Sequence, residues 1–330
     1  MWYNYIQESF SGGTNPPHFG VKKQMNSVKI RAYAKVNLTL EITGREDGFH
    51  LLDSLVASVD LYDLVKAVKR KDELSSVTMR GMGSESIPPE KNNALQAAEA
   101  FSKAFGVNGV DITVFKNIPI GAGLGGSSAD IAGVLLAMQK LYGIKDDRAV
   151  EALAETLGSD VKYMLRGGYA RMRGRGEKLE PIEGVKDKLW LLLLCPACGV
   201  SAGACYRKYD ELNAVDYSFG NTVRAINALT AGDKEALGAC LKNDLYPAAT
   251  ALEEGVARTL AEAESFSPLG ACMTGSGSGA FALFETRELC EWAKSRYKGK
   301  ARAMVVSTLE PKKQEKGGWF FPFALKPDEQ

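Results

Sequence analysis

The sequence predicts an α+β protein with two domains. Strand-like alternation and helical periodicity interleave irregularly along the chain, which favours α+β over a strict βαβ array. The chain has 330 residues, enough for a sizeable core and two domains. Its composition, 45% apolar and 25% charged, is that of a globular protein, and no repeat of fixed period occurs.

The strands are predicted from alternation of apolar residues or from short apolar runs. Residues 28–42 alternate as a pair of strands would, and residues 110–115 alternate strictly. The longest apolar run, LWLLLLC, has the size of a buried strand and is too short to span a membrane. This run lies within the strand-like segment 188–195. Further strand-like segments are 53–70, with mixed alternation, 169–182 and the apolar run within 270–285.

Helices are predicted where apolar residues recur at helical spacing. The segment 92–106 has Asn92 or Asn93 as its N-cap and Gly106 as its stop. Residues 146–158 form a second helix, which begins at an acid and ends at a glycine.

Both ends of the chain differ from the periodic region. Residues 1–25 are polar, aromatic and interrupted by Gly and Pro, so we interpret them as a disordered N-terminal extension. Residues 311–330 are charged and then aromatic, and form a C-terminal extension. The folded region between them divides into an N-terminal domain, 26–175, and a C-terminal domain, 176–310.

The overall charge and the first residues restrict the class of protein. A net charge of +1 gives no indication of nucleic-acid or membrane binding. The first 20 residues lack the basic start and apolar core of a secretory signal, and they contain no arginine. We therefore expect a cytoplasmic protein with reduced cysteines.

Cys195 and Cys198 form a CxxC pair, the spacing found in zinc sites. Such a site needs two further ligands, but only Cys205 is near, and the two histidines, His18 and His50, are far away in sequence. Buried thiols at the end of a strand are the favoured interpretation.

The stretch NIPIGAGLGGSSADIAGVLLAMQKLYG places a glycine-rich loop before a helical pattern. Exposed backbone N–H groups at a helix start bind anions, most often phosphate. Ser127 or Ser128 is the expected cap of this helix. A Walker loop is excluded because no lysine follows the glycines, and protein kinases are excluded because HRD and DFG elements are absent.

A dinucleotide fingerprint remains formally possible, because Gly121, Gly123 and Gly126 form GxGxxG. That site also needs an acid at the end of a second strand about 20 residues on. Asp146 and Asp147 stand at this distance but start a helix, so the context disfavours this alternative.

The segment PIGAGLGGSSAD resembles the phosphate loop of the GHMP small-molecule kinases, P-x-x-x-G-L-G-x-S-S-A, between a strand and a helix. The resemblance implies that backbone N–H groups of this loop wrap the phosphates of ATP. It also implies that Mg²⁺ bridges these phosphates, with Ser128 as a contact. The implied ATP-binding residues are Pro119, Gly121, Gly123, Leu124, Gly125, Gly126, Ser127 and Ser128.

Three further stretches are similar to one family of this superfamily, the 4-diphosphocytidyl-2-C-methyl-D-erythritol kinases. They are AKVNLTLEITGREDGFHLLDSLVASVDLYD, GSDVKYMLRGGYARMRGRGEKLEPI and MTGSGSGAFALF, in the family's order. The resemblance extends over about residues 28–309. Phe49, Ser127, Lys162 and Ser278 depart from the family's usual Tyr, Gly, Pro and Pro, and none of these changes removes a charged catalytic group.

The resemblance implies a ribosomal-S5-like N-terminal domain and a ferredoxin-like C-terminal domain, with the active site between them. The implied reaction is ATP-dependent phosphorylation of the 2-hydroxyl of 4-diphosphocytidyl-2-C-methyl-D-erythritol in the non-mevalonate isoprenoid pathway. We expect a monomer or weak homodimer. Two alternatives remain: a GHMP kinase for homoserine, mevalonate or a sugar, and a non-catalytic nucleotide-binding protein.

Lys35 and Asp160 match the family's catalytic pair. The carboxylate would accept the proton of the substrate hydroxyl, and the ammonium would stabilise the resulting oxygen. The alternatives are that Asp160 is only a helix cap and that Lys35 is a solvated strand residue. The apolar surroundings in AYAKVNL favour an inward lysine.

Phe49 and His50 match the residues that recognise cytosine, and Tyr206 matches a second aromatic that stacks on the base, although Tyr209 lies one helical turn away. By resemblance, a second loop backs the substrate with Gly275, Ser276 and Gly277. Arg171, Arg173 and Arg175 either face phosphate or, as favoured, form a solvated strand face.

Overall fold

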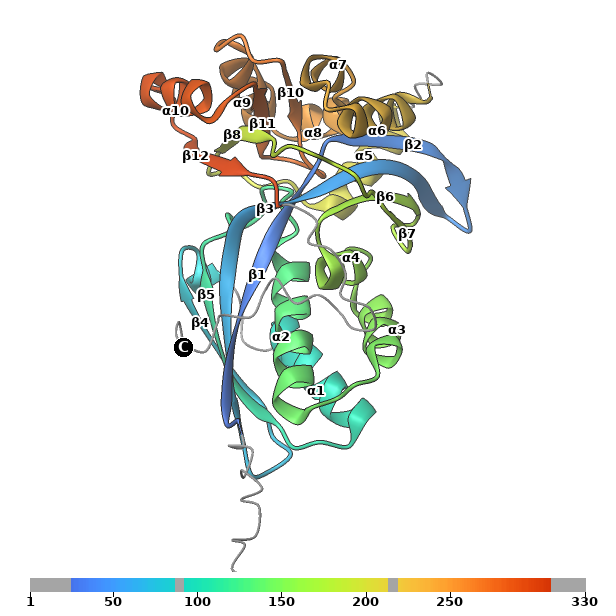
Figure 1. Cartoon of the computed structure of the whole chain (residues 1–330), viewed down its shortest axis with the longest axis vertical. Helices are drawn as coiled ribbons and strands as arrows, with labels where there is room; N and C mark the ends of the chain where they lie inside the picture. The colour runs from blue at the N-terminus through green and yellow to red at the C-terminus, as the bar shows by residue number, and fades with distance from the viewer. Residues whose placement is uncertain (1–24, 87–91, 213–218, 310–330) are drawn as a thin grey trace, which may run out of the picture.

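The computed structural model describes residues 25–86, 92–212 and 219–309. They form two β-sheets with helices packed on them, which confirms the predicted α+β class (Figure 1). The predicted extensions 1–25 and 311–330 lie outside the described residues except for Met25, which is exposed just before the first strand.

The larger sheet is organised around β3, a strand of 21 residues. β3 pairs antiparallel with β1, β2, β5 and β6 along different parts of its length. The predicted pair of strands at 28–42 is therefore two successive strands that both pair with β3 and not with each other. The strands of this sheet are β1 (Ser27–Asn37), β2 (Thr39–Glu46), β3 (Phe49–Lys69), β4 (Ser76–Gly81), β5 (Val110–Lys116), β6 (Tyr169–Gly174), β7 (Lys178–Pro181) and β9 (Lys242–Asn243).

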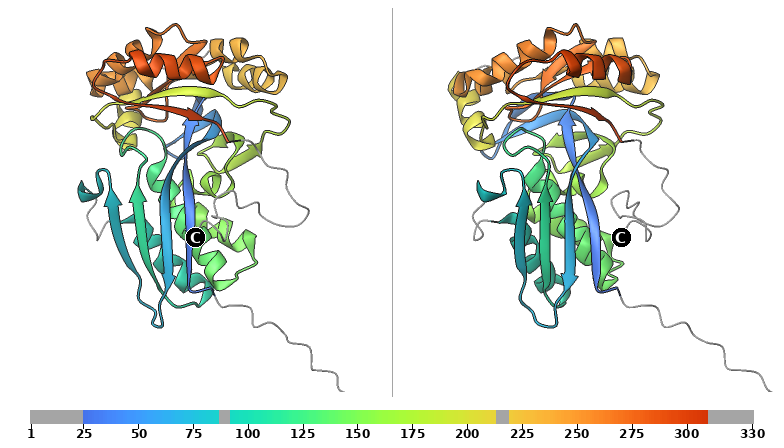
Figure 2. Two further views of the ribbon diagram at one scale, coloured as in Figure 1. Left: turned by 60° about the vertical axis from the view of Figure 1, so that its left-hand side comes forward. Right: turned by 90° about the vertical axis from the view of Figure 1, so that its left-hand side faces the viewer.

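Helices α1 to α4 cover one face of this sheet (Figures 1 and 2). The central α2 is buried along most of its length because it packs between the sheet and the other helices. Two predicted helices are confirmed with their caps: Asn92 and Gly106 bound one, and Asp146 begins the other. The elements are η1 (Ser84–Ser86), α1 (Asn93–Phe105), α2 (Gly126–Tyr142), α3 (Asp147–Leu157) and α4 (Val161–Arg166).

The second sheet has four antiparallel strands in the order β10-β11-β8-β12. The connection from β8 through helices to the β10–β11 hairpin, then α10 and β12, is the split βαβ arrangement of a ferredoxin-like domain. The apolar run predicted as a buried strand is β8, whose Leu191, Leu192, Leu193 and Leu194 are fully buried. The strands of this smaller sheet are β8 (Trp190–Cys195), β10 (Gly270–Met273), β11 (Ala280–Phe284) and β12 (Arg302–Ser307).

The helices of the second half lie above and beside this smaller sheet. Helices α9 and α10 pack on its side away from the larger sheet, so the smaller sheet lies between them and the rest of the molecule (Figure 2). None of the helices among the described residues is long and apolar enough to cross a bilayer. The helices are α5 (Ala202–Leu212), α6 (Asn221–Ala231), α7 (Lys234–Ala239), α8 (Tyr246–Leu252), α9 (Glu254–Glu264) and α10 (Arg287–Arg296).

The larger sheet contains strands from both halves of the chain. β9, from the second half, pairs parallel with β2 of the larger sheet. The predicted boundary after residue 175 falls between β6 and β7, which pair with each other, and the smaller sheet begins at Trp190. The division of the chain at residue 175 stays a prediction.

Two glycine-rich loops, residues 119–125 and 274–279, hold the two halves together by main-chain contacts. The N–H of Ser278 donates to the carbonyl of Gly121 at 3.1 Å, and the N–H of Gly279 donates to the carbonyl of Ala122 at 3.2 Å. The two loops lie too close together for any side chain at position 279, because a Cβ on Gly279 would lie 2.6 Å from the Ala122 carbonyl oxygen.

Gly123→Ala should destabilise the fold strongly, because the new methyl would overlap the carbonyl oxygen of Thr274 and the backbone has a φ of +72°. Gly143→Ala is the matched control, with a φ of +67° and nothing within 4 Å of its Cβ. The control should cost about 1–2 kcal/mol from backbone strain alone. Gly123→Ala should cost about 1–3 kcal/mol more, measured by urea denaturation. Equal costs would show that the loops separate easily.

Candidate active site

A cavity of about 980 Å³ lies where the two glycine loops meet. It is lined from both halves of the chain, and every site residue expected from the sequence lines it except Gly277. The N–H of Gly277 donates to the carbonyl of Thr274 at 3.0 Å, so this glycine shapes the second loop. The cavity thus brings together the phosphate loop, the expected catalytic pair and the expected base-binding residues.

Lys35 and Asp160 meet in this cavity, from β1 and from the start of α4. The Nζ of Lys35 lies 3.6 Å from the Oδ2 of Asp160. Lys35 follows an irregularity in the β1–β3 register, a local distortion of the type that redirects a side chain. It is 5% exposed, so the alternative of a solvated strand lysine is wrong.

Asp160 stands at the N-cap position of α4, but its side chain makes no capping hydrogen bond. Its side chain is 31% exposed and lines the cavity. The carboxylate is therefore not occupied by helix capping, and it can accept a proton from a ligand in the cavity while the neighbouring ammonium offsets its charge.

A chain of buried hydrogen bonds fixes the position of the Lys35 ammonium. The Lys35 ammonium donates to the Oδ1 of Asn37, whose Nδ2 donates to the Oγ of Ser54 at 2.8 Å. The Ser54 hydroxyl donates to the carbonyl of Thr39. Sequence analysis missed Asn37 and Ser54, although Asn37 lies two residues after Lys35 on one strand and therefore on the same face.

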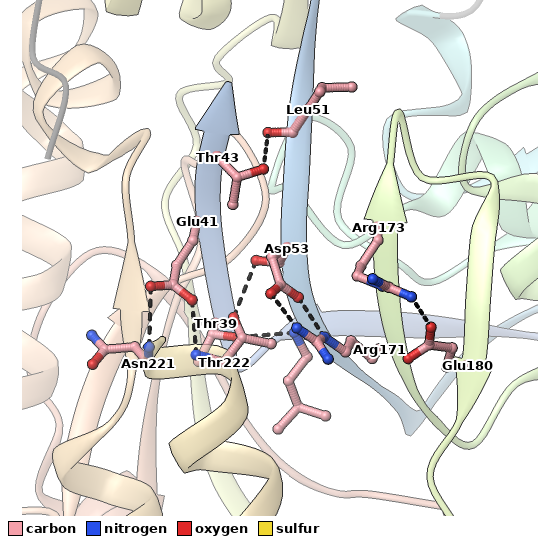
Figure 3. Close-up of polar contacts among 11 residues, drawn as sticks. Thr39, Glu41, Thr43, Leu51, Asp53, Arg171, Arg173, Glu180, Asn221 and Thr222 are labelled. Atoms are coloured by element: carbon pink, nitrogen blue, oxygen red, sulfur yellow. Dashed lines mark hydrogen bonds and ion pairs between the residues drawn. The ribbon is translucent and has the colours of Figure 1, made fainter. Parts of the chain in front are cut away.

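This polar chain continues to helix α6 (Figure 3). The hydroxyls of Thr39 and Thr222 lie 2.8 Å apart, and the fully buried Thr222 also donates to the carbonyl of Asp53. The carboxylate of Glu41 accepts from the backbone N–H groups of Asn221 and Thr222, at the start of α6, where a negative charge is favourable. The active-site strand and the C-terminal helices are thus joined by satisfied buried groups.

The three arginines of 169–175 all pair with carboxylates. Arg171 forms a two-pronged ion pair with Asp53, and Arg173 pairs with Glu180 (Figure 3). Only Arg175 lines the cavity. Bonding to Asp53 raises the pKa of Arg171. Arg173 is exposed, as the favoured interpretation of a solvated strand face expects, whereas Arg171 is half-buried in its pair with Asp53.

The phosphate loop leads directly into α2. The N-cap of α2 is Gly125, with a φ of +70° and no side-chain cap, so the predicted Ser127 or Ser128 cap is wrong. Ser127 and Ser128 instead lie inside the first turn, where their backbone N–H groups have no partner within the helix. The positive φ of Gly125 favours glycine, and a Cβ there would also displace the terminal methyl group of Met164 and crowd Lys35.

Beneath this loop lies a buried ionic cluster of Lys116, Asp63 and Asp130. The Lys116 ammonium pairs with both carboxylates, at 2.6 Å from Asp130. The other oxygen of Asp63 accepts from the backbone N–H groups of Asn117 and Ile118, where the chain enters the loop. The two carboxylates raise the pKa of Lys116 against the effect of burial, and burial raises the pKa of Asp130.

Ser128 and Asp130 are the residues of this cavity best suited to contact a magnesium ion or its bound water. Both line it, and the buried Oδ1 of Asp130 has no hydrogen-bond partner among the described residues. Hydroxyl and carboxylate oxygens are ligands that Mg²⁺ accepts, and this ion commonly takes its other ligands from phosphate and water. The described part of the chain contains no group of three His, Cys, Asp or Glu side chains that could hold a metal ion by themselves.

The far end of the cavity is aromatic. The rings of His50 and Tyr206 stack with centroids 5.0 Å apart, and the buried Tyr209 contacts His50 edge-on without lining the cavity. This favours Tyr206 over Tyr209 as the second aromatic. Phe49 is 57% exposed, and the Arg175 guanidinium lies 4.2 Å from its ring centroid.

The six cysteines of the chain are all free thiols. Cys195 is buried at the end of β8 and Cys198 is half-buried just after it, as the favoured interpretation of the CxxC pair expects.

The fold and this cavity define a GHMP small-molecule kinase. Residues 92–170 match the GHMP kinases N terminal domain, and residues 225–298 match the GHMP kinases C terminal family. The expected two-domain fold of this superfamily is thereby confirmed. GHMP kinases use ATP as the phosphoryl donor.

Similarity to curated and solved proteins identifies the family. The 4-diphosphocytidyl-2-C-methyl-D-erythritol kinase of Clostridium beijerinckii is 34% identical over 279 residues, which cover 82% of this chain and 97% of that protein. A crystal structure of 4-(cytidine 5'-diphospho)-2C-methyl-D-erythritol kinase superposes with a TM-score of 0.68 and 32% identity, over 85% of this chain and 98% of that one. The chain belongs to the 4-diphosphocytidyl-2-C-methyl-D-erythritol kinase family.

A homoserine kinase of Cytophaga hutchinsonii superposes almost as well, with a TM-score of 0.67 over 88% of this chain and 98% of that one. Its sequence identity is 20%, so this likeness reflects the shared fold alone.

Lys116→Met should destabilise the protein by about 3–5 kcal/mol, because it leaves two buried carboxylates without their cation. Lys162→Met is the matched control, since it removes a lysine whose pair with Glu155 lies at the surface and should cost about 0–1 kcal/mol. Urea denaturation at neutral pH measures both. A small effect of Lys116→Met would contradict an ionised cluster under the loop.

Proposed function

We propose that the protein phosphorylates the 2-hydroxyl of 4-diphosphocytidyl-2-C-methyl-D-erythritol with ATP, a step of the non-mevalonate route to isoprenoid precursors. One observation carries the proposal. The Lys35–Asp160 pair lies in a single cavity with a glycine loop at the start of α2 on one side and an aromatic, histidine-containing end on the other. Such a cavity suits a nucleotide triphosphate, a reacting alcohol and a second base.

In the proposed reaction, the hydroxyl oxygen attacks the γ-phosphorus of ATP, and the bond from that phosphorus to the bridging oxygen breaks to release ADP. Asp160 accepts the hydroxyl proton, and the Lys35 ammonium, 3.6 Å away, stabilises the attacking oxygen as its negative charge grows. The N–H groups at the start of α2 hold the phosphates in line for this attack.

We propose that Mg²⁺ accompanies ATP, with Ser128 and Asp130 on its side of the cavity. When bound, a magnesium ion would neutralise negative charge on the transferred phosphoryl group. The unpartnered carboxylate oxygen of Asp130 and the hydroxyl of Ser128 supply oxygen atoms for the ion or its bound water.

At the other end, we propose that the cytosine stacks between Phe49 and Tyr206, with His50 at its polar edge. The exposure of Phe49 and the position of Tyr206 on the cavity wall support this arrangement. Gly275 and Ser276 back the middle of the substrate. Every group used comes from one chain, so the proposed site is complete in a monomer or weak homodimer. The six free thiols are compatible with a cytoplasmic location.

The main alternative is a GHMP kinase for a small alcohol such as homoserine or mevalonate. The aromatic end of the cavity argues against it, because such a substrate has no base to fill the space beside Phe49 and Tyr206. A non-catalytic nucleotide-binding protein is disfavoured because Lys35 and Asp160 are both present and adjacent.

The purified full chain, supplied with ATP and Mg²⁺, should phosphorylate 4-diphosphocytidyl-2-C-methyl-D-erythritol and leave homoserine and mevalonate unchanged. Coupled detection of ADP, with mass spectrometry of the product, measures this. The cavity predicts discrimination because the smaller alcohols leave the aromatic end unfilled. Turnover of homoserine without turnover of the cytidyl compound would overturn the proposal.

Asp160→Asn should lower kcat by about 10²–10⁴-fold, because the amide cannot accept the hydroxyl proton. ATP binding, measured by calorimetry, should survive because the phosphate loop is unchanged. Asp146→Asn serves as the control: it removes the same charge at a helix N-cap, where asparagine caps equally well. If Asp160→Asn turned over substrate at the normal rate, Asp160 would have no part in the proton transfer.

A further inference from the structure

The carboxylate of Asp210, on α5, bridges two residues of the β2–β3 hairpin. Its Oδ1 lies 2.7 Å from the Nε2 of His50, and its Oδ2 lies 3.2 Å from the Nη1 of Arg45. Asp210 stands one helical turn after Tyr206, and both side chains line the cavity at its aromatic end. Neither Asp210 nor Arg45 was singled out by the sequence.

We propose that Asp210 is a positioning and specificity-determining residue, which fixes the tautomer of His50 so that the enzyme accepts cytosine and rejects uracil. The inference rests on the proposed function, because it concerns the base of that substrate. Asp210 acts through His50 and is not itself placed on the reacting atoms.

The argument begins with the two nitrogens of a histidine ring. The hydrogen bond that one nitrogen makes determines where the proton of the neutral ring resides. A carboxylate is an acceptor only, so Asp210 requires Nε2 of His50 to carry hydrogen. Nδ1 is then an acceptor, and among the described residues it has no hydrogen-bond partner, which leaves it for a ligand.

Two further contacts keep this arrangement in place. Arg45 contacts the other oxygen of Asp210, so the carboxylate is held from both sides with Oδ1 directed at His50. The ring of His50 is packed face-on by Tyr206 at 5.0 Å and edge-on by Tyr209 at 5.7 Å. A rotation that exchanged the two ring nitrogens would break the Asp210 bond and disturb both contacts.

Cytosine and uracil differ at one position of the pyrimidine edge in a way that this geometry detects. Cytosine presents an amino group at C4, a donor, where uracil presents a carbonyl oxygen. An acceptor Nδ1 on His50 pairs with the amino group and repels the carbonyl. With uracil bound, the Nδ1 of His50 would have no hydrogen-bond donor, and an unpaired polar group in a binding site lowers affinity. The tautomer of His50 therefore determines which base is accepted.

The tautomer can be measured directly, because the chain contains only two histidines, His18 and His50. Long-range ¹H–¹⁵N NMR of the ¹⁵N-labelled full chain at pH 8, with His18→Gln for assignment, should show Nε2 protonated and Nδ1 unprotonated in His50. In Asp210→Ala the two tautomers should mix. A protonated Nδ1 in the parent chain, or an unchanged spectrum in Asp210→Ala, would overturn the inference without any assay of activity.

Kinetics test the consequence for specificity. The parent chain should prefer the cytidine substrate over the matching uridine diphosphate alcohol by about 100-fold or more in kcat/KM. Asp210→Ala should reduce this preference to about tenfold or less, mainly by raising KM for the cytidine substrate. Asp210→Asn should retain most of it, because the amide oxygen still accepts from Nε2.

Glu211→Ala is the matched control, since it removes a neighbouring charge of α5 whose partner is Lys208 and not His50. It should leave the preference unchanged. An undiminished preference in Asp210→Ala, with the parent active on the cytidine substrate, would refute the role of Asp210 alone. An inactive parent would refute the proposed function, and the NMR result would then stand independently.

Discussion

The main-chain contact between the two glycine loops is the constraint on which the rest of the site depends. Two backbone hydrogen bonds, from Ser278 to Gly121 and from Gly279 to Ala122, join the phosphate loop to the smaller sheet. A third runs from the N–H of Lys35 to the carbonyl of Leu124, and fixes β1 to the same loop. The loop therefore has one position relative to the expected catalytic lysine and to the C-terminal half of the cavity wall.

The two buried lysines near this loop have different partners, and this difference assigns them different tasks. Lys116 is paired with two carboxylates, one of which also binds the backbone where the chain enters the loop, so it stabilises the loop from below. Lys35 faces a single carboxylate at 3.6 Å and donates to the neutral amide of Asn37. Its charge is less fully compensated and remains effective for an oxygen that becomes negative in the cavity.

Much of the fold was predictable because its signals are local. Caps at Asn92, Gly106 and Asp146, and the apolar run of β8, depend on neighbours within a few residues. The pairing of β9 with β2, and the multiple partners of β3, depend on segments far apart in sequence, which periodicity does not report. Lys35, Asp160 and the loop came from contiguous motifs. Asn37 and Asp210 were missed because their importance arises only from the side chains beside them in space.

The failure of the predicted serine cap follows from the same geometry. A serine cap would require an extended residue at the start of α2, but the loop arrives there through Gly123 and Gly125, both with positive φ. Gly123 is needed for the approach of the Thr274 backbone, whereas a Cβ on Gly125 would displace the end of the Met164 side chain and crowd Lys35. These glycines therefore serve the contact between the two halves of the chain as much as the approach of phosphate. The glycines of this phosphate-binding motif therefore also allow the two halves of the chain to pack closely. This close packing fixes the spacing between the nucleotide loop and the expected catalytic lysine.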